Sequence, residues 1–186
     1  NGVTKHYGTE LRKHILNALQ DGDSDVRNAA LAALQTLLEK GVEVQEMVSP
    51  MLNALQDRDR CLREFAIEVL GTLLEHGAEV QEMLPPILNA LQDSHADVRE
   101  AALKALRALL EKGVEVQGVV PPMLNALQDR DFPVREAALK ALRTLLLEKG
   151  AEVQGMITPI LNVLQDRHAG VRWAALAALG TLLEQG

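Results

Sequence analysis

The chain has 186 residues, a formal net charge of −7, 47% hydrophobic residues and only 2% aromatic residues. The apolar fraction excludes a disordered chain, the single cysteine excludes a disulfide framework, and the acidic balance gives no general attraction to nucleic acid or anionic membranes. With so few aromatic side chains, the core has to consist of Leu, Ala, Val, Ile and Met, which indicates helices packed on helices.

A sequence repeat of about 36 residues occupies the whole chain. Leu-Gln-Asp recurs in every copy, an arginine follows its aspartate six residues later, and a glycine closes the unit. We expect a single domain over 1–186, with copies at approximately 1–50, 51–86, 87–122, 123–159 and 160–186, the last of them truncated. The aspartates are Asp21, Asp57, Asp93, Asp129 and Asp166, and the arginines are Arg27, Arg63, Arg99, Arg135 and Arg172.

The first helix of a copy is represented in copy two by residues 44–56. Its apolar residues recur at steps of three and one, as in a helix with one buried stripe. Pro50 interrupts this segment, as Pro86, Pro122 and Pro159 do in later copies. A proline inside a helix bends it, whereas a proline at the first helical position after a separate turn does not, and both arrangements remain open.

The second helix is represented in copy one by residues 26–40. Asp25 and, in copy three, Asp97 are expected to cap these helices at their N-termini, and Gly41 and its counterparts are expected to stop them. Ala-Ala-Leu, at 29–31 and in later copies, puts small residues where helices approach closely. One such pair of helices cannot bury its apolar stripe alone, so neighbouring copies are expected to stack.

This combination resembles the HEAT repeat family over nearly the whole chain. The features that carry the resemblance are a proline in the first helix, an aspartate at its end, Val-Arg six residues later and an alanine-rich second helix. The resemblance implies an all-α fold, a right-handed α-α superhelix (solenoid) of five helical hairpins. It also implies that aspartate and arginine form a ladder between adjacent repeats, with Asp57, Arg63 and their counterparts as members. HEAT proteins include transport receptors, phosphatase scaffolds, bilin lyases and a few enzymes.

The second helices line the concave face in that family, and here their outward residues differ between copies. One interpretation is a groove for a protein or peptide; the other is a solvated face of i,i+4 charge pairs. Trp173 could anchor a partner, shield the open C-terminal end, or pack against a missing sixth repeat. The candidate partner-binding residues are Glu64, Glu68, Glu100, Lys104, Arg107, Glu136, Lys140, Arg143 and Trp173.

Catalytic and metal-binding patterns are not found in the sequence. The five histidines form no His-x-x-x-His arrangement, there is no Gly-rich phosphate loop or Ser elbow, and Cys61 has no recurrent base near it. We therefore expect no enzymatic activity, no cofactor and no metal ion. Phe132, which we place in the loop between the two helices of copy four, is the exposed apolar candidate among the loops.

The two ends of the array differ in polarity. The first helix of copy one carries Gly8, Arg12 and His14 where later copies are less polar, as a terminal cap would. The C-terminal segment 182–186 has no polar cap, so we expect an exposed apolar flank that self-associates or belongs to a longer array.

The function predicted from these features is a non-enzymatic protein-protein interaction scaffold. The alternatives are an engineered or consensus-like repeat protein without a natural ligand, and a HEAT-like lyase. Apolar runs are far shorter than the ~20 residues of a membrane span and no targeting segment is visible, so we expect a cytoplasmic, intracellular protein. Its expected partner is a protein or peptide, with neither nucleic acid nor a membrane as a ligand.

Overall fold

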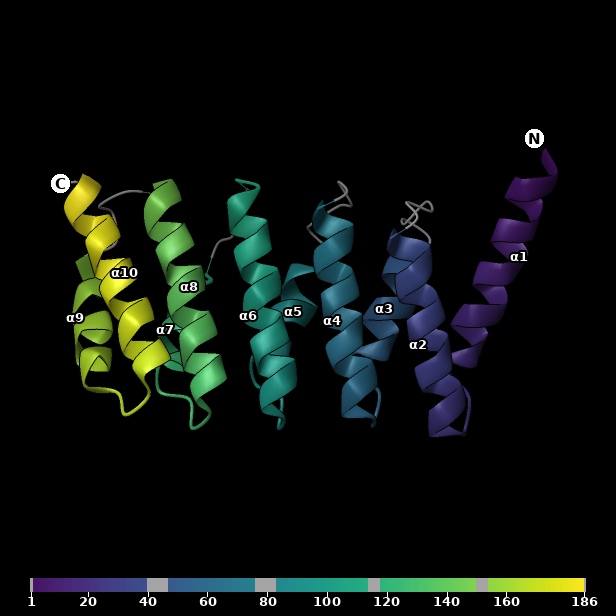
Figure 1. Ribbon diagram of the computed structural model, residues 1–186, viewed down its shortest axis with the longest axis horizontal. Helices are drawn as coiled ribbons and strands as arrows, with labels where there is room; N and C mark the ends of the chain where they lie inside the picture. Colours follow the sequence, from purple (N-terminus) through teal and green to yellow (C-terminus); the bar gives the residue numbers. More distant parts are fainter. Residues whose placement is uncertain (1, 40–46, 76–82, 114–117, 150–153, 186) are drawn as a thin grey trace.

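The computed structural model describes residues 2–39, 47–75, 83–113, 118–149 and 154–185. Every regular element in these residues is helical, and the helices follow one another as hairpins (Figure 1). The predicted all-α solenoid is confirmed. The helices are α1 (Gly2–Ala18), α2 (Ser24–Glu39), α3 (Val48–Ala54), α4 (Arg60–Glu75), α5 (Leu84–Ala90), α6 (Ala96–Glu111), α7 (Val120–Ala126), α8 (Phe132–Lys149), α9 (Gln154–Asn162), the 3-10 helix η3 (Val163–Gln165) and α10 (Ala169–Gln185).

The second helices of the hairpins form one layer. In Figure 1, α2, α4, α6, α8 and α10 stand side by side, and α3, α5, α7 and α9 lie behind them. Contacts run in series from α4 to α6, from α6 to α8 and from α8 to α10. The repeat limits predicted at the prolines fall inside α3, α5, α7 and α9. The first hairpin begins with α1, and each later hairpin begins with one of those four helices.

The first helices of copies two to four are short. In copy two, α3 covers seven residues, Val48–Ala54, and ends before the predicted limit at Gln56, whereas residues 44–46 of the predicted range lie outside the described residues. Pro50 is its third residue, and the double prolines of α5 and α7 stand at the second and third helical positions. Backbone N–H groups in the first turn have no intrahelical acceptor, so proline is tolerated there. Copy five differs, because Pro159 lies inside α9.

The predicted N-caps of the second helices are wrong. Asp25 lies within the first turn of α2, and the carboxylate of Asp23 accepts the backbone N–H groups of Asp25 (2.8 Å) and Val26 (3.4 Å). The N-cap of α6 is His95, and Asp97 is again in the first turn. A carboxylate in that turn still interacts favourably with the helix dipole.

One predicted helix stop lies within the described residues. Gly113 follows α6 with φ +69°, and its N–H donates to the carbonyl of Leu110 at 2.8 Å. Such a left-handed conformation suits glycine at a helix C-terminus. Gly41, Gly77, Gly150 and Gly186 lie outside the described residues.

The core is aliphatic, as expected from the composition. First helices contribute residues such as Met51, Ile87 and Met123, and second helices contribute Leu106 and Leu142, all fully buried. The second helices also contribute fully buried alanines, at Ala66, Ala102, Ala138 and Ala175. Among the described helices, none has the length and hydrophobicity needed to cross a membrane.

Candidate functional site

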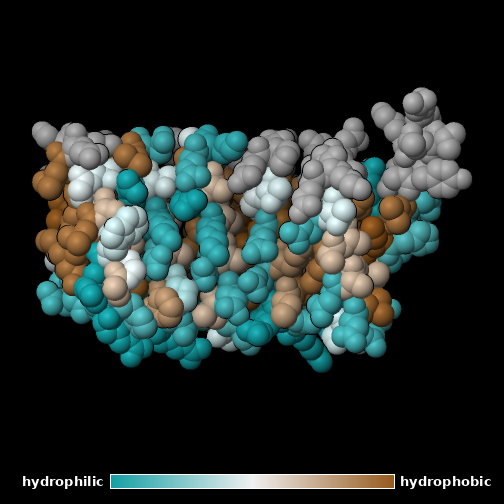
Figure 2. All heavy atoms as spheres, viewed as in Figure 1, coloured by the Kyte–Doolittle hydropathy of each residue, from teal (hydrophilic) through white to brown (hydrophobic). Residues whose placement is uncertain are grey.

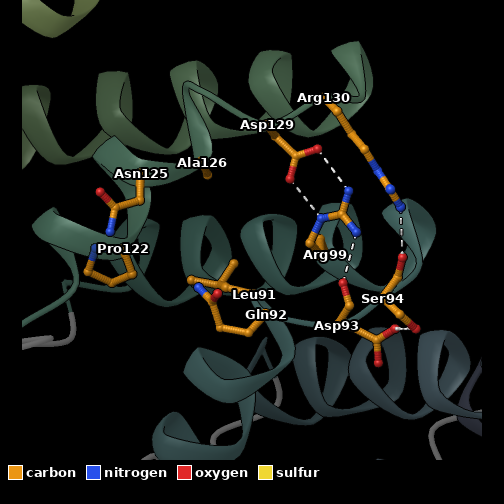
Figure 3. A pocket seen from close by; sticks show the side chains of 10 residues that line it. All are labelled: Leu91, Gln92, Asp93, Ser94, Arg99, Pro122, Asn125, Ala126, Asp129 and Arg130. Atoms are coloured by element: carbon orange, nitrogen blue, oxygen red, sulfur yellow. Dashed lines mark hydrogen bonds and ion pairs between the residues drawn. The ribbon is translucent and has the colours of Figure 1, made fainter.

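The aspartate and arginine of the repeat meet between adjacent hairpins. Arg99, at the start of α6, donates from Nε and Nη2 to the two carboxylate oxygens of Asp129, at 2.7 and 2.8 Å. Its Nη1 donates to the backbone carbonyl of Asp93 at 2.8 Å. Figure 3 shows this fork beside a cavity of about 420 Å³, and Arg130 reaches across the opening to the carbonyl of Ser94.

The pairing runs from the arginine of one repeat to the aspartate of the next. Arg63 pairs in the same two-pronged way with Asp93, at 2.7 and 3.0 Å, and Arg135 with Asp166 at the same distances. Within its own repeat, Arg63 contacts only the backbone carbonyls of Asp57 and Arg58. The bidentate contact with a carboxylate therefore joins adjacent repeats. The contacts of Nη1 with backbone carbonyls hold the turn inside each repeat.

The ends of the ladder differ from its middle. Arg27 donates from Nη2 to Asp59 at 2.9 Å instead of to Asp57, and its Nε is buried without an acceptor. Arg172 contacts the backbone carbonyls of Asp166 and Arg167, and no carboxylate within the described parts of the chain accepts from it. The first junction therefore has a single hydrogen bond from guanidinium to carboxylate. The last arginine, Arg172, has no carboxylate acceptor in the described residues.

Each ladder aspartate also shapes its own turn. One carboxylate oxygen accepts the N–H of the residue two positions on: Asp23, Asp59, His95, Asp131 and His168, at 2.8–2.9 Å. This local bond is the Asx turn that aspartate favours in loops. At Asp93, Asp129 and Asp166 the same carboxylate also receives the arginine of the preceding repeat, so turn and ladder depend on the same side chain there.

These contacts favour the charged form of the four carboxylates that accept from the repeat arginines. Hydrogen bonds from Arg27 and Arg135 are the main reason that the pKa values of Asp59 and Asp166 are lowered. At Asp93 and Asp129 burial raises the pKa, but the hydrogen bonds from Arg63 and Arg99 and from the turn N–H groups outweigh it, and the net pKa is lowered. The ladder is therefore a stabilising feature whose strength depends on ionised carboxylates.

The predicted partner-binding residues lie on the outer face of the second helices, and most of their charges are paired there. Lys104 contacts Glu100 at 2.8 Å, Lys140 contacts Glu136 at 2.6 Å, and Arg107 contacts Glu111 at 3.0 Å. Arg143 instead donates to the hydroxyl of Thr181 on α10, at 3.2 Å. Figure 2 shows these hydrophilic side chains over the middle of the face.

The two ends of this face carry different groups. On α4, Glu68 is exposed and Glu64 is half-buried; the pKa of Glu64 is raised by burial and by the nearby carboxylates of Asp97 and Glu68. On α10, Trp173 is 64% exposed. The acidic end therefore favours a cation as its neighbour, and the other end offers an open aromatic surface.

Two hollows connect α4, α6 and α8 on this face. One, of about 230 Å³, lies between α6 and α8 and is bordered by Phe132 and by the charged residues of both helices. The other, of about 340 Å³, lies between α4 and α6 and includes Glu68 and Gly71. Lys104 borders both hollows, so they follow one another along the face.

Phe132 is the residue that sequence reasoning placed incorrectly. It begins α8 instead of lying in a loop, it is 43% exposed, and its ring stacks on His168 with centroids 4.2 Å apart. His168 lies one repeat further along the chain and was not singled out. The exposed aromatic position could be seen in the sequence, but the stacking partner depends on the packing of repeats.

The comparison with protein families agrees with this architecture. The model of HEAT repeats matches residues 12–107 and 84–154, and the model of a HEAT-like repeat matches residues 133–182. The chain belongs to the HEAT repeat family. No curated protein sequence matches it.

Solved structures similar to this HEAT repeat protein share its fold at low sequence identity. A designed armadillo repeat protein in complex with the peptide (KR)4 has a TM-score of 0.67 and 19% identity, over 97% of this chain and 85% of that one. The complex of CpcE and CpcF of phycocyanin lyase from Nostoc has 0.69 and 22%, over 93% and 65%. Cex1p has 0.71 and 19%, over 94% and 35%.

The HEAT ladder predicts a specific response to acid. The folded pKa values of Asp59, Asp93, Asp129 and Asp166 are lowered, so their stabilisation is complete above the unfolded pKa of about 3.9 and is lost as the pH falls through the folded values. We expect the urea midpoint to be constant near neutral pH and to fall steeply below about pH 4. Asp166→Asn should lower the neutral midpoint and flatten this acid limb. A midpoint independent of pH down to the acid range would contradict the assignment.

Proposed function

We propose that the chain is a non-enzymatic scaffold that binds a peptide or protein segment along the second helices. The observation that carries the proposal is the pair of hollows joined at Lys104, which provides an extended path across α4, α6 and α8. An exposed aromatic ring, Phe132, stands at the α8 end of the path, and two glutamates, Glu64 and Glu68, stand at its α4 end. Aromatic anchors with a polar surround are common at binding surfaces.

The charges on the path support binding because their present partners hold them weakly. Exposed i,i+4 ion pairs such as Lys104 with Glu100 contribute only about 0.2–1 kcal/mol. A ligand carboxylate or cation can replace such a partner at small cost. We expect a segment with basic side chains opposite Glu64 and Glu68 and an apolar side chain against Phe132. A designed armadillo repeat protein with a similar fold forms a complex with the peptide (KR)4, which supports a basic peptide as the ligand.

A displayed library of extended peptides, selected on the immobilised chain, tests the proposal. Binding of the selected peptides should fall about tenfold or more in Phe132→Ser and in Glu64→Lys with Glu68→Lys. Arg58→Glu is the control, because Arg58 is exposed in a loop outside both hollows. Failure to select any peptide, or equal loss in the control, would contradict the proposal and leave the ligand-free repeat protein as the alternative.

The lyase alternative has its own observation, since the similar Nostoc structure is a phycocyanin lyase complex. Incubation of the chain with a free bilin, followed by absorption spectroscopy, separates the two. The scaffold proposal predicts no spectral change, whereas a bound chromophore would favour the lyase.

A further inference from the structure

The two ends of the array expose complementary halves of the junction that joins its repeats. Counting from the ladder aspartate of each repeat, the position five residues later is exposed by 41% at Val26 but by at most 1% at Leu62, Val98, Val134 and Val171. The position ten residues earlier behaves alike: Leu11 is 52% exposed, and its counterparts Met47, Met83, Val119 and Met156 are buried. These two positions are therefore the ones that a preceding repeat covers.

The C-terminal end exposes the other half. Leu176 is 59% exposed, whereas its counterparts Leu31, Ile67, Leu103 and Leu139 are buried. Leu183 is 84% exposed, and its counterparts Leu74, Leu110 and Leu146 are buried. A following repeat covers these two positions in the interior of the array, and Figure 2 shows the hydrophobic surface they leave over α9 and α10 at the left end of the molecule.

The ladder is divided between the ends in the same way. Arg172 has no carboxylate acceptor among the described residues, although Arg63, Arg99 and Arg135 each have one in the next repeat. Asp21 accepts the turn N–H of Asp23, and no arginine side chain in the described residues donates to its carboxylate; Asp57 shares this feature inside the array, because Arg27 pairs with Asp59. One end therefore presents a guanidinium without its carboxylate, and the other presents a carboxylate without its guanidinium.

We propose that a second copy of this chain continues the array head to tail. The α9–α10 end of one copy docks on the α1–α2 end of the next, with Arg172 paired to Asp21 and with Leu176 and Leu183 covering Leu11 and Val26. The arrangement reproduces an internal junction, so apolar burial and ion pairing act together as they do between α6 and α8. A contact between unlike ends does not close on itself, so the assemblies grow as open chains instead of stopping at a dimer.

The charge pairing selects this occupant over an end-to-end dimer of two C-termini. A symmetric contact of that kind would bring both copies of Arg172 to one interface and would leave Asp21 without a guanidinium. A two-fold contact also leaves Leu11 and Val26 exposed. The polar residues at the N-terminal end do not prevent docking, since Leu11 and Val26 lie among them with a large part of their surface open.

Sedimentation velocity over a wide range of protein concentration tests the proposal through a charge swap. The wild-type mass should rise with concentration past the dimer. Asp21→Arg and Arg172→Asp should each weaken association about tenfold or more, because like charges then meet at the junction. An equimolar mixture of the two variants should associate again, and so should the double variant, since each restores one guanidinium opposite one carboxylate.

The apolar half of the junction has a separate variant. Leu183→Asp should weaken association about tenfold or more without changing the circular dichroism of the monomer, because this side chain is almost fully exposed. Arg58→Glu, in an exposed loop of the second repeat, is the control and should associate as the wild type does. A chain that stays monomeric at every concentration would overturn the proposal, and so would a dimer that is insensitive to Asp21→Arg.

Discussion

Leu103→Ala is expected to destabilise the folded chain by about 3 kcal/mol, whereas Leu176→Ala is expected to change its stability by less than about 0.5 kcal/mol. The two leucines occupy the same position of the repeat, ten residues after the ladder aspartate. Leu103 is fully buried on α6 between neighbouring repeats, and Leu176 is mostly exposed on α10. Because both substitutions are Leu→Ala at the same repeat position, the difference between them measures how much the following repeat contributes to the stability gained by burying this leucine.

The size of the Leu103 effect follows from the packing around it. Alanine removes a buried isobutyl group and leaves a cavity, because helices held on two sides can collapse only partly. Urea unfolding followed by circular dichroism gives both midpoints, and it should be done at low protein concentration, where Leu176 stays uncovered. Equal destabilisation by the two variants would show that an adjacent repeat contributes nothing to the burial of this position.

The repeat frame could be predicted from the sequence because it rests on local periodicity. The spacing of Leu-Gln-Asp fixed the number of copies, and the apolar steps indicated two helices in each. The positions of the prolines were visible, but their effect was not. Pro50 lies in the first turn of α3 because that helix begins at Val48. Pro159 lies inside α9 because that helix begins earlier relative to its proline, at Gln154.

The errors concern contacts between residues that the repeat brings together. The sequence predicts Asp25 and Asp97 as the N-caps of α2 and α6. In the structure the carboxylate of Asp23, two residues before Asp25, accepts the N–H groups at the start of α2. The N-cap of α6 is His95, two residues before Asp97. The sequence analysis predicts a loop at Phe132, but Phe132 begins α8 and Pro133 stands in the first turn of that helix, where proline is tolerated.

The direction of the ladder needed three-dimensional information. Each arginine lies six residues after the aspartate of its own repeat and about thirty residues before the aspartate of the next. The sequence spacing is compatible with a contact to either aspartate. The structure divides the two: the backbone carbonyl is taken within the repeat and the carboxylate across the junction. Because the carboxylate contact crosses the junction, Arg172 at the last repeat has no carboxylate acceptor in the described residues, and this follows from the packing of repeats and not from the sequence spacing.

Arg99→Met is expected to destabilise the protein by about 2–4 kcal/mol at neutral pH. Arg99 has a side chain that is 9% exposed, and it holds Asp129, Asp131 at 3.0 Å and the carbonyl of Asp93. Methionine keeps most of the apolar stem but leaves the half-buried Asp129 carboxylate without a counter-charge. Arg172→Met is the matched control, because Arg172 contacts only backbone carbonyls, and a loss of about 1 kcal/mol is expected for it.

The pH dependence of the Arg99→Met defect identifies its cause. The substitution removes the hydrogen bond and the charge of Arg99, which lower the pKa of Asp129, and leaves its burial, so we expect the variant to bind the carboxyl proton at a higher pH than the wild type does. The folded wild type loses its ladder contribution as the pH falls, while the variant has already lost it at neutral pH. The difference in urea midpoint between the two should therefore shrink toward acid. A difference that stays constant from neutral to acid pH would assign the loss to the packing of the arginine stem instead of to the ion pair.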